Sequence, residues 1–367
     1  MAMLCCSARP KSVAEFVYVA PAPISSPHAT LVEGIYEAPD GTMLSRRSWT
    51  PINATQAARC IVLIHGLAEH SARYHEMGEF FAKAGCVVHA YDQRGHGKSG
   101  GFKNFVSNFD EYIEDGMAFL HLVRSEHPEM SHVLIGHSMG GLVAARMLAM
   151  RAPNVTCAVL SGPALSIPPG GAAQDAKIAV VKTLASVLPK LTVDTAISLD
   201  GLASDPEVGR MCVPLRRPRN LISVALVLYT YSALSDRVAP GTHCHLDTQF
   251  AVDSLCGPCS YDADPLIDTN ITLSLADTLL RAQADVDSGL CDAATITVPV
   301  LGLHGADDPI CTPAATEAFL SRVVTKGSRA KLYPGLRHEI FNEPSKRDVW
   351  AHILDFVQDV EQAATKQ

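Results

Sequence analysis

The sequence lacks any long apolar run and any excess of basic residues. Its longest apolar segment, residues 221–234, is too short to cross a bilayer as a helix, and its N-terminal stretch lacks the apolar core of a secretory signal. Acidic residues outnumber basic ones by 38 to 30, which argues against nucleic acid or an anionic membrane surface as an electrostatic partner. We therefore expect a cytoplasmic protein that binds no nucleic acid.

The sequence also lacks the even, ordered set of cysteines that a disulfide-stabilised domain needs. Its 11 cysteines are an odd number and are scattered, and Cys60, Cys86 and Cys157 fall within apparent core strands. This pattern favours a reducing compartment. Apolar residues make up 47% of the chain and charged residues 19%, so its 367 residues suit one large globular domain or two ordinary ones.

Strand and helix patterns alternate along most of the chain. A hairpin is expected over 34–49, and continuous β-branched runs, which predict buried strands, alternate with segments of helical periodicity. The strands are expected at 60–66, 87–92, 133–135, 155–163, 298–305 and 330–335, and the helices at 73–85, 108–128, 142–150, 312–325 and 348–362. Such repeated units predict an α/β fold with a mostly parallel central sheet flanked by helices.

The alternation stops after residue 163 and resumes at residue 298. We interpret residues 164–297 as a helical cap that is inserted over the carboxyl ends of the strands. The core is then formed by residues 32–163 as its first part and residues 298–362 as its second part.

The segment HVLIGHSMGGLVAARML, residues 132–148, places a serine between two glycines where a strand pattern gives way to a helix pattern. Gly136, Ser138 and Gly140 form G-x-S-x-G, and a sharp strand-to-helix turn leaves no room for Cβ atoms at the two glycine positions. Such a turn exposes the hydroxyl, so Ser138 is a candidate nucleophile. The motif alone also fits an ordinary turn that carries a surface serine.

A serine nucleophile needs a base and a group that orients the base. In this architecture an acid and then a histidine should follow the serine, on loops after later strands. Asp307 and Asp308 follow the strand at 298–305, and His338 follows the last strand. These three residues are therefore the candidates for the acid and the base.

Acyl transfer also needs backbone N–H donors for the oxyanion. Met139 follows the nucleophile and can supply one N–H group. Leu67 lies in the loop after the strand at 60–66 and can supply the second, although its side chain would narrow the pocket.

Five segments occur in order along the chain: HGLAEHSARY, YDQRGHGKSGG, GHSMGG, HGADDPICT and GLRHEIFNE. Together they resemble the motif set of the monoacylglycerol lipase family of α/β-hydrolases, over residues 32–210 and 261–358. The resemblance implies an α/β-hydrolase fold and ester hydrolysis by a Ser–Asp–His triad. It favours Asp308 over Asp307, because the family acid lies three residues after the glycine of this loop, here Gly305.

The resemblance also implies substrate-binding residues, which are Glu69, Arg73, Tyr261 and Cys311. Glu69 and Arg73 would line the narrow end that holds a glycerol headgroup. Two positions depart from the family: Leu67 is larger than the usual residue, and Phe341 replaces a histidine that some members carry. Both departures bear on headgroup selectivity and not on hydrolysis. No metal and no organic cofactor is implied.

These features predict hydrolysis of monoacylglycerol to free fatty acid and glycerol through an acyl-serine intermediate. The apolar helix expected at 176–189 is either cap core or the wall of an acyl-chain tunnel that touches a membrane surface transiently. Lysophospholipase, carboxylesterase, acyltransferase and S33-type aminopeptidase reactions use the same groups and stay open. An alternative of another class is a non-catalytic binding protein of this fold. Such a protein would normally have a damaged triad, whereas the triad of this sequence is intact. The sequence does not indicate an oligomeric state.

Residues 211–260 interrupt the family pattern, which runs from SDPEVGR almost directly to YDADPL. Histidines and cysteines of this insert could hold a metal or form a redox C-G-P-C pair, but no βαβ context surrounds that motif. Alternatively, the codons for 211–213 and 259–260 can contain a splice donor and a splice acceptor. Removing the sequence between these sites keeps the frame and leaves one isoleucine. We therefore interpret the insert as a retained intron that the working enzyme lacks.

Overall fold

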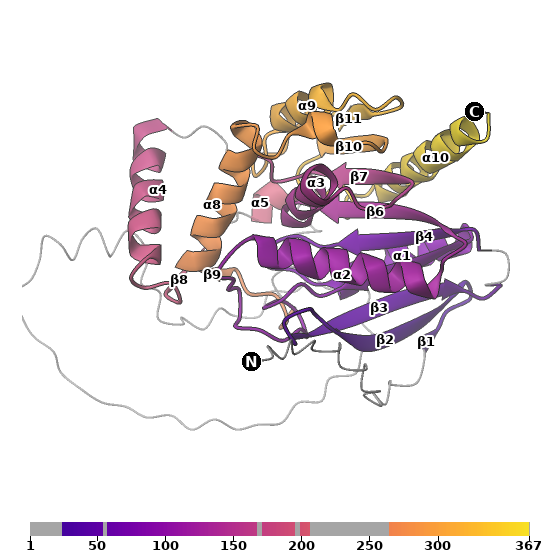
Figure 1. Cartoon of the computed structure of the whole chain (residues 1–367), viewed down its shortest axis with the longest axis horizontal. Helices are drawn as coiled ribbons and strands as arrows, with labels where there is room; N and C mark the ends of the chain where they lie inside the picture. The colour runs from indigo at the N-terminus through magenta and orange to yellow at the C-terminus, as the bar shows by residue number, and fades with distance from the viewer. Residues whose placement is uncertain (1–23, 54–56, 167–170, 195–198, 206–263, 367) are drawn as a thin grey trace, which may run out of the picture.

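The computed structural model of the protein describes residues 24–53, 57–166, 171–194, 199–205 and 264–366. A nine-stranded sheet runs through this described part (Figure 1). Its strands are β1 Ile24–Ser25, β2 Ala29–Glu37, β3 Met43–Pro51, β4 Arg59–Ile64, β5 Cys86–Tyr91, β6 Ser131–His137, β7 Cys157–Ser161, β10 Val300–Gly305 and β11 Arg329–Tyr333. They lie in the order β1-β2-β3-β5-β4-β6-β7-β10-β11.

The larger part of the sheet is parallel, as the sequence predicts. Each pair of neighbours from β5 through β11 is parallel, whereas β1, β2, β3 and β5 pair antiparallel. The expected hairpin is formed by β2 and β3, with Glu37 opposite Met43. The parallel strands end at one edge of the sheet, where their following loops converge.

Alternate residues of the central strands pack on opposite faces of the sheet. In β4, Cys60, Val62 and Ile64 belong to one buried cluster, while Ile61 and Leu63 belong to the other. Both faces are therefore apolar, which explains why this strand reads as a continuous apolar run instead of an alternating one.

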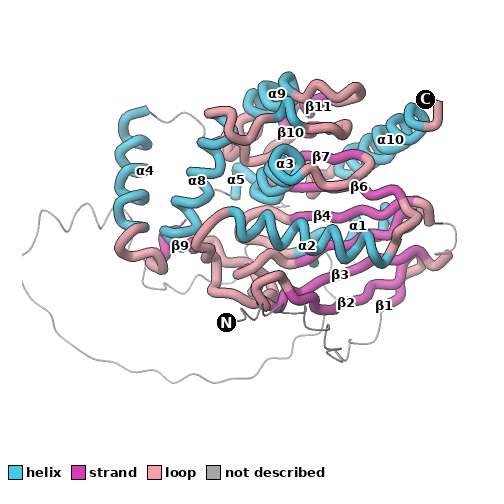
Figure 2. The backbone as a smooth tube through the Cα atoms, viewed as in Figure 1, coloured by secondary structure: helices cyan, strands magenta, loops and turns pink. Residues whose placement is uncertain are grey.

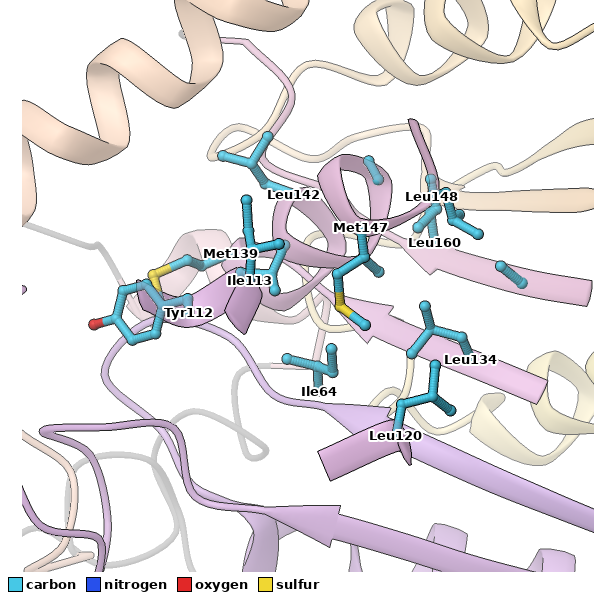
Figure 3. Close-up of a cluster of buried hydrophobic side chains, with 14 of the residues drawn as sticks. Ile64, Tyr112, Ile113, Leu120, Leu134, Met139, Leu142, Met147, Leu148 and Leu160 are labelled. Atoms are coloured by element: carbon cyan, nitrogen blue, oxygen red, sulfur yellow. The ribbon is translucent and has the colours of Figure 1, made fainter. Parts of the chain in front are cut away.

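Helices cover both faces (Figure 2). The first face carries α2 Asp110–Glu126, α3 Met139–Arg151 and α9 Pro313–Arg322, and the second carries α1 His75–Lys83 and α10 Lys346–Ala364. Figure 3 shows how α2 and α3 pack on the first face, where Leu120 and Met147 lie against Leu134 and Ile64 of the sheet. This packing holds the start of α3, and with it Ser138, in a fixed position.

The segment between β7 and β10 contributes its own elements. They are α4 Gly171–Ala185, β8 Thr192–Asp194, α5 Leu199–Leu202, β9 Asn270–Thr272 and α8 Leu273–Asp287. β8 and β9 form a separate two-stranded antiparallel sheet, and α4 lies beside α8 (Figure 1). The apolar helix expected at 176–189 is α4, which begins and ends earlier. The insert at 211–260 and Tyr261 lie outside the described residues. No helix of the described part is both long and apolar enough to cross a membrane.

Candidate active site

Ser138 lies on a strained turn between β6 and α3. Its φ of 53° falls in the left-handed region, which is unusual for a residue other than glycine. A Cβ atom on Gly136 would lie 2.3 Å from the carbonyl oxygen of Gly140, and one on Gly140 would lie 2.3 Å from that of Ile64. Glycine is therefore required at both positions for the strand and helix to approach this closely.

Ser138, His338 and Asp308 form one hydrogen-bonded line. Oγ of Ser138 lies 2.9 Å from Nε2 of His338, and Nδ1 of His338 lies 2.7 Å from Oδ2 of Asp308. The carboxylate accepts the Nδ1 proton, which leaves a lone pair on Nε2 to accept the serine proton. This is the arrangement in which a serine hydroxyl is activated by an oriented imidazole. The structure thus brings together three residues that span 200 positions of the chain.

Asp308 is held as an ionised, fixed acceptor. Its two oxygens accept N–H groups from His338, His304, Ile310 and Cys311 at 2.7 to 3.0 Å. Burial opposes ionisation, but the hydrogen bonds from His304 and His338 outweigh it and hold the pKa of Asp308 well below its ordinary value. The neighbouring candidate Asp307 instead lies at the surface.

His304 is a participant that the sequence reasoning missed. It is fully buried at the end of β10, its Nε2 lies 2.9 Å from Asp308, and its Nδ1 lies 2.7 Å from Oγ1 of Thr316. Because the carboxylate accepts from Nε2, the hydroxyl of Thr316 donates to Nδ1. A histidine as the penultimate residue of the strand, four positions before the candidate acid, was the available signal.

The two candidate oxyanion donors belong to turns that approach the same serine. Met139 is the first residue of α3, and Leu67 follows β4 in a turn where Ala68 has a φ of 58°. The preceding Gly66 lies close enough to Ser138 that a Cβ atom on it would meet the serine Cβ at 3.1 Å. The loop after β4 therefore packs directly on Ser138.

Glu69 and Arg73 are engaged with other protein groups. Glu69 accepts hydrogen bonds from the Gly66 N–H and from the Tyr74 hydroxyl, and it accepts one from Nη1 of Arg73 at 2.7 Å. Arg73 also binds both oxygens of Glu339, at 2.9 and 2.8 Å. Their expected role at a glycerol headgroup stays a prediction.

Cys311 lies beside the reacting groups. Its thiol, the Asp308 carboxylate and the His338 ring place one donor atom each within 4.8 Å of one another. Burial and the neighbouring Asp308 raise the pKa of Cys311, so the thiol stays protonated and weakly nucleophilic. Phe341 is buried, with its ring 5.9 Å from that of His137, and it adds no polar group to the site.

A second group with metal-ligand chemistry occurs in the described residues, at Cys60, His89 and His127. The guanidinium of Arg46 lies 3.3 Å from Nδ1 of His89, and Nε2 of His89 lies 3.0 Å from Nε2 of His127. Because arginine can only donate, the neutral His89 ring carries its proton on Nε2 and gives it to His127. The two imidazole rings of this group are therefore hydrogen-bonded to one another and to Arg46.

An oriented serine at a strand-to-helix turn of a mostly parallel sheet defines a serine hydrolase with the α/β-hydrolase fold. The chain belongs to the family described as serine aminopeptidase, S33, whose model matches residues 55–345.

Comparison with known proteins agrees with the resemblance that the motifs predict. The chain is 28% identical over 310 residues to the monoacylglycerol lipase of Mycolicibacterium smegmatis, covering 84% of this chain and 90% of that protein. It is 25% identical to the human monoglyceride lipase, with 83% and 82% coverage. A soluble variant of the monoglyceride lipase from Saccharomyces cerevisiae, solved with a substrate analog, shares the fold at a TM-score of 0.67, with 19% identity and 89% and 94% coverage.

Proposed function

We propose that the protein hydrolyses carboxylic esters of single-chain lipids, above all monoacylglycerols, to free fatty acid and alcohol. The observation that carries this proposal is the hydrogen-bonded line from Ser138 through His338 to Asp308. The relatives named monoacylglycerol lipase and monoglyceride lipase support the choice of substrate. In this reaction Ser138 is the nucleophile, His338 the base and Asp308 the group that orients and stabilises the base.

The acylation step follows from these positions. Nε2 of His338 removes the proton of Ser138 as Oγ attacks the ester carbonyl, and the Asp308 carboxylate stabilises the imidazolium that forms. The N–H groups of Leu67 and Met139 stabilise the tetrahedral oxyanion. His338 then returns its proton to the departing alcohol oxygen, and the acyl group remains bonded to Ser138.

Deacylation reverses these roles with water as the nucleophile. His338 takes a proton from the water that attacks the acyl carbonyl, and the released proton returns to Oγ of Ser138. Free fatty acid leaves, and the resting hydrogen bond between Ser138 and His338 forms again.

A substrate panel tests this function. We expect the highest kcat/KM with monooleoylglycerol, lower values with lysophosphatidylcholine and p-nitrophenyl butyrate, and no turnover of an aminoacyl p-nitroanilide. The Ser138→Ala variant is the control for each substrate. Fastest turnover of the anilide would replace the proposal with aminopeptidase activity, and fastest turnover of lysophosphatidylcholine would replace it with lysophospholipase activity.

We further propose that residues 164–297 cap this site and touch the lipid surface transiently through α4 and the turn after it. Val187 and Leu188 support this, because their side chains are 74% and 49% exposed. Lys177 and Lys182 of the preceding α4 are also exposed and add positive charge to this segment. An exposed apolar turn after a helix that carries exposed lysines suits the interface between lipid headgroups and acyl chains. The cytoplasmic location stays a prediction, which the unpaired state of the five described cysteines supports.

A further inference from the structure

The two halves of the proposed site come from strands that are not neighbours. The oxyanion turn follows β4, and the loop that carries His338 follows β11. In the sheet, β6, β7 and β10 separate these two strands. Backbone pairing within the sheet therefore cannot by itself fix the distance between the oxyanion donors and the base.

Arg73 joins the two loops directly. Its guanidinium binds Glu69, beside the oxyanion turn, at 2.7 Å and binds both oxygens of Glu339, the residue after His338, at 2.9 and 2.8 Å. The side chains of Arg73, Glu69 and Glu339 are only 10%, 3% and 5% exposed. A planar guanidinium that bridges two carboxylates in so little water forms a directional link, which a single point charge would not reproduce.

Each carboxylate is also attached to the loop that it serves. Glu69 accepts the N–H of Gly66, which is the residue directly before Leu67. Glu339 is held through its side chain by Nδ2 of Asn342 at 2.8 Å, and its N–H donates to the Leu202 carbonyl at 2.7 Å. A displacement of Arg73 would therefore be transmitted to both loops.

We propose that Arg73 is a positioning residue that sets the oxyanion turn and the His338 loop at their working separation. This inference rests on the ester hydrolysis proposed above and replaces a headgroup contact as the main role of Arg73. A misplacement of reacting groups by about 1 Å can reduce turnover about 100-fold, so such a link has a large kinetic effect.

The charges of Arg73 and its two carboxylate partners predict how the activity of an Arg73 variant depends on pH. Burial opposes ionisation, but Arg73 overrides it and lowers the pKa of both Glu69 and Glu339. The rings of His65 and His137 and the Tyr74 hydroxyl also face this pair, and burial holds the pKa of both rings below its ordinary value. Without Arg73, two buried like charges therefore face one another, both carboxyl pKa values rise, and repulsion separates the loops at high pH. At lower pH one carboxyl group takes up a proton and can donate it to the other. A variant without the guanidinium should therefore recover activity relative to the wild type as the pH falls.

The experiment compares Arg73→Met with Arg59→Met as a matched control. Arg59 forms a comparable partly buried pair with Glu361, with contacts of 2.7 to 3.1 Å, at the opposite ends of the strands. Each variant is assayed on monooleoylglycerol and on p-nitrophenyl butyrate, which has no glycerol group. For Arg73→Met we expect kcat to fall about 10- to 100-fold on both esters with KM nearly unchanged. Arg59→Met should keep the wild-type kcat.

Two further measurements sharpen the test. The ratio of Arg73→Met to wild-type kcat should rise as the pH is lowered from about 8 to about 6. The double variant Arg73→Met, Glu339→Gln removes the repulsion and should recover part of the loss with a flatter pH profile. If Arg73→Met does not fold, Arg73→Lys replaces it, and an intermediate loss of kcat with little pH trend is expected, because the ammonium keeps the charge and loses only the two-pronged geometry of the guanidinium.

Three results would overturn the proposal. One is wild-type kcat in Arg73→Met or, where it does not fold, in Arg73→Lys. Another is a loss confined to KM for monooleoylglycerol, which would restore the headgroup role. The third is a ratio of Arg73→Met to wild-type kcat that does not rise at low pH. If the wild-type protein hydrolysed no ester, the proposed function would be rejected. The rates at which a fluorophosphonate labels Ser138 in the wild type and in Arg73→Met would then test the positioning role of Arg73 separately.

Discussion

The loops that end the parallel strands differ sharply from the segment that lies between β7 and β10. Around Ser138 the side chains of His137, Asp308 and His338 are buried and hydrogen-bonded, as the four donors on Asp308 show. In α4 most side chains are exposed or half-buried, and its neighbour is α8 (Figure 1). The first region holds its polar side chains through hydrogen bonds between buried groups, whereas the second presents its side chains to solvent.

The proposed function assigns the reaction to the loops at the strand ends and contact with the lipid phase to the segment between β7 and β10. Proton transfer needs a fixed geometry, which close packing and hydrogen bonds supply. Under the proposed function, lipid substrates need an apolar surface that tolerates many acyl chains, and we expect the exposed Val187 and Leu188 after α4 to contribute to it. We therefore expect substitutions near the strand ends to reduce kcat on every ester, and substitutions in the turn after α4 to affect only substrates in a lipid phase.

The largest effect is expected from Ser138→Ala. Removing the hydroxyl removes the nucleophile, so hydrolysis should fall roughly 10⁴- to 10⁶-fold on soluble and lipid esters alike. Loss of covalent labelling by a fluorophosphonate checks the same atom. Unchanged circular dichroism is the control for folding. Turnover near the wild-type rate would move the nucleophile to another residue.

Asp308→Asn should come next. The amide can keep the side chain in place, but it cannot stabilise an imidazolium and can leave His338 in the wrong tautomer, so kcat should fall about 10⁴-fold. The matched control is Asp307→Asn, because Asp307 lies at the surface of the same loop. Its kcat should stay near that of the wild type. Equal losses in the two variants would contradict the choice of Asp308.

Local sequence patterns predicted the core well because each part of it obeys a local rule. The glycines around Ser138 are needed by a turn of a few residues, and the apolar runs of β4 and β5 follow from burial on both faces. The expected helix at 108–128 is α2. The helix expected at 73–85 begins later, because a 3-10 turn capped by His70 occupies Ser71–Tyr74 before α1 starts.

Long-range partners could not be predicted in this way. Arg73 and Glu339 are 266 positions apart, and nothing near either residue specifies the other. The helix α8 was missed although Thr272 caps it by accepting from the Leu275 N–H, because the break in alternation after residue 163 suggested no regular core element there. Its cap and its apolar spacing were the signals available.

His304→Ala tests whether the hydrogen bond from His304 to Asp308 contributes to the geometry of the site. Losing its N–H leaves Asp308 with three of its four donors, so kcat should fall about 10-fold on every ester with little change in KM. Thr316→Val removes only the hydroxyl that donates to Nδ1 of His304 and should give a smaller loss. A change in KM alone, on lipid substrates only, would place His304 in substrate binding instead.

The double variant Val187→Asp, Leu188→Asp tests the exposed apolar turn after α4. Charges on these exposed residues should weaken adsorption to vesicles, because each costs transfer free energy at the interface. We expect a several-fold loss of monooleoylglycerol hydrolysis in vesicles and unchanged hydrolysis of p-nitrophenyl butyrate. Leu290→Asp with Val324→Asp is the matched control, since these residues are 74% and 77% exposed elsewhere on the molecule. Loss on the soluble ester would mean that the chemistry, not access, was disturbed.

The smallest effect is expected from removing the insert. We expect a chain in which one isoleucine joins Arg210 to Tyr261 to keep full turnover of p-nitrophenyl butyrate. The described residues on either side are anchored independently: Ser204 donates to Glu343 at 2.7 and 2.6 Å, and Asp264 lies 2.7 Å from Nε2 of His70. Because these anchors belong to the core, they do not depend on 211–260. Sequencing transcripts across this region checks the intron interpretation, and uniformly unspliced messages would refute it. A shortened chain that did not fold would contradict the expected turnover.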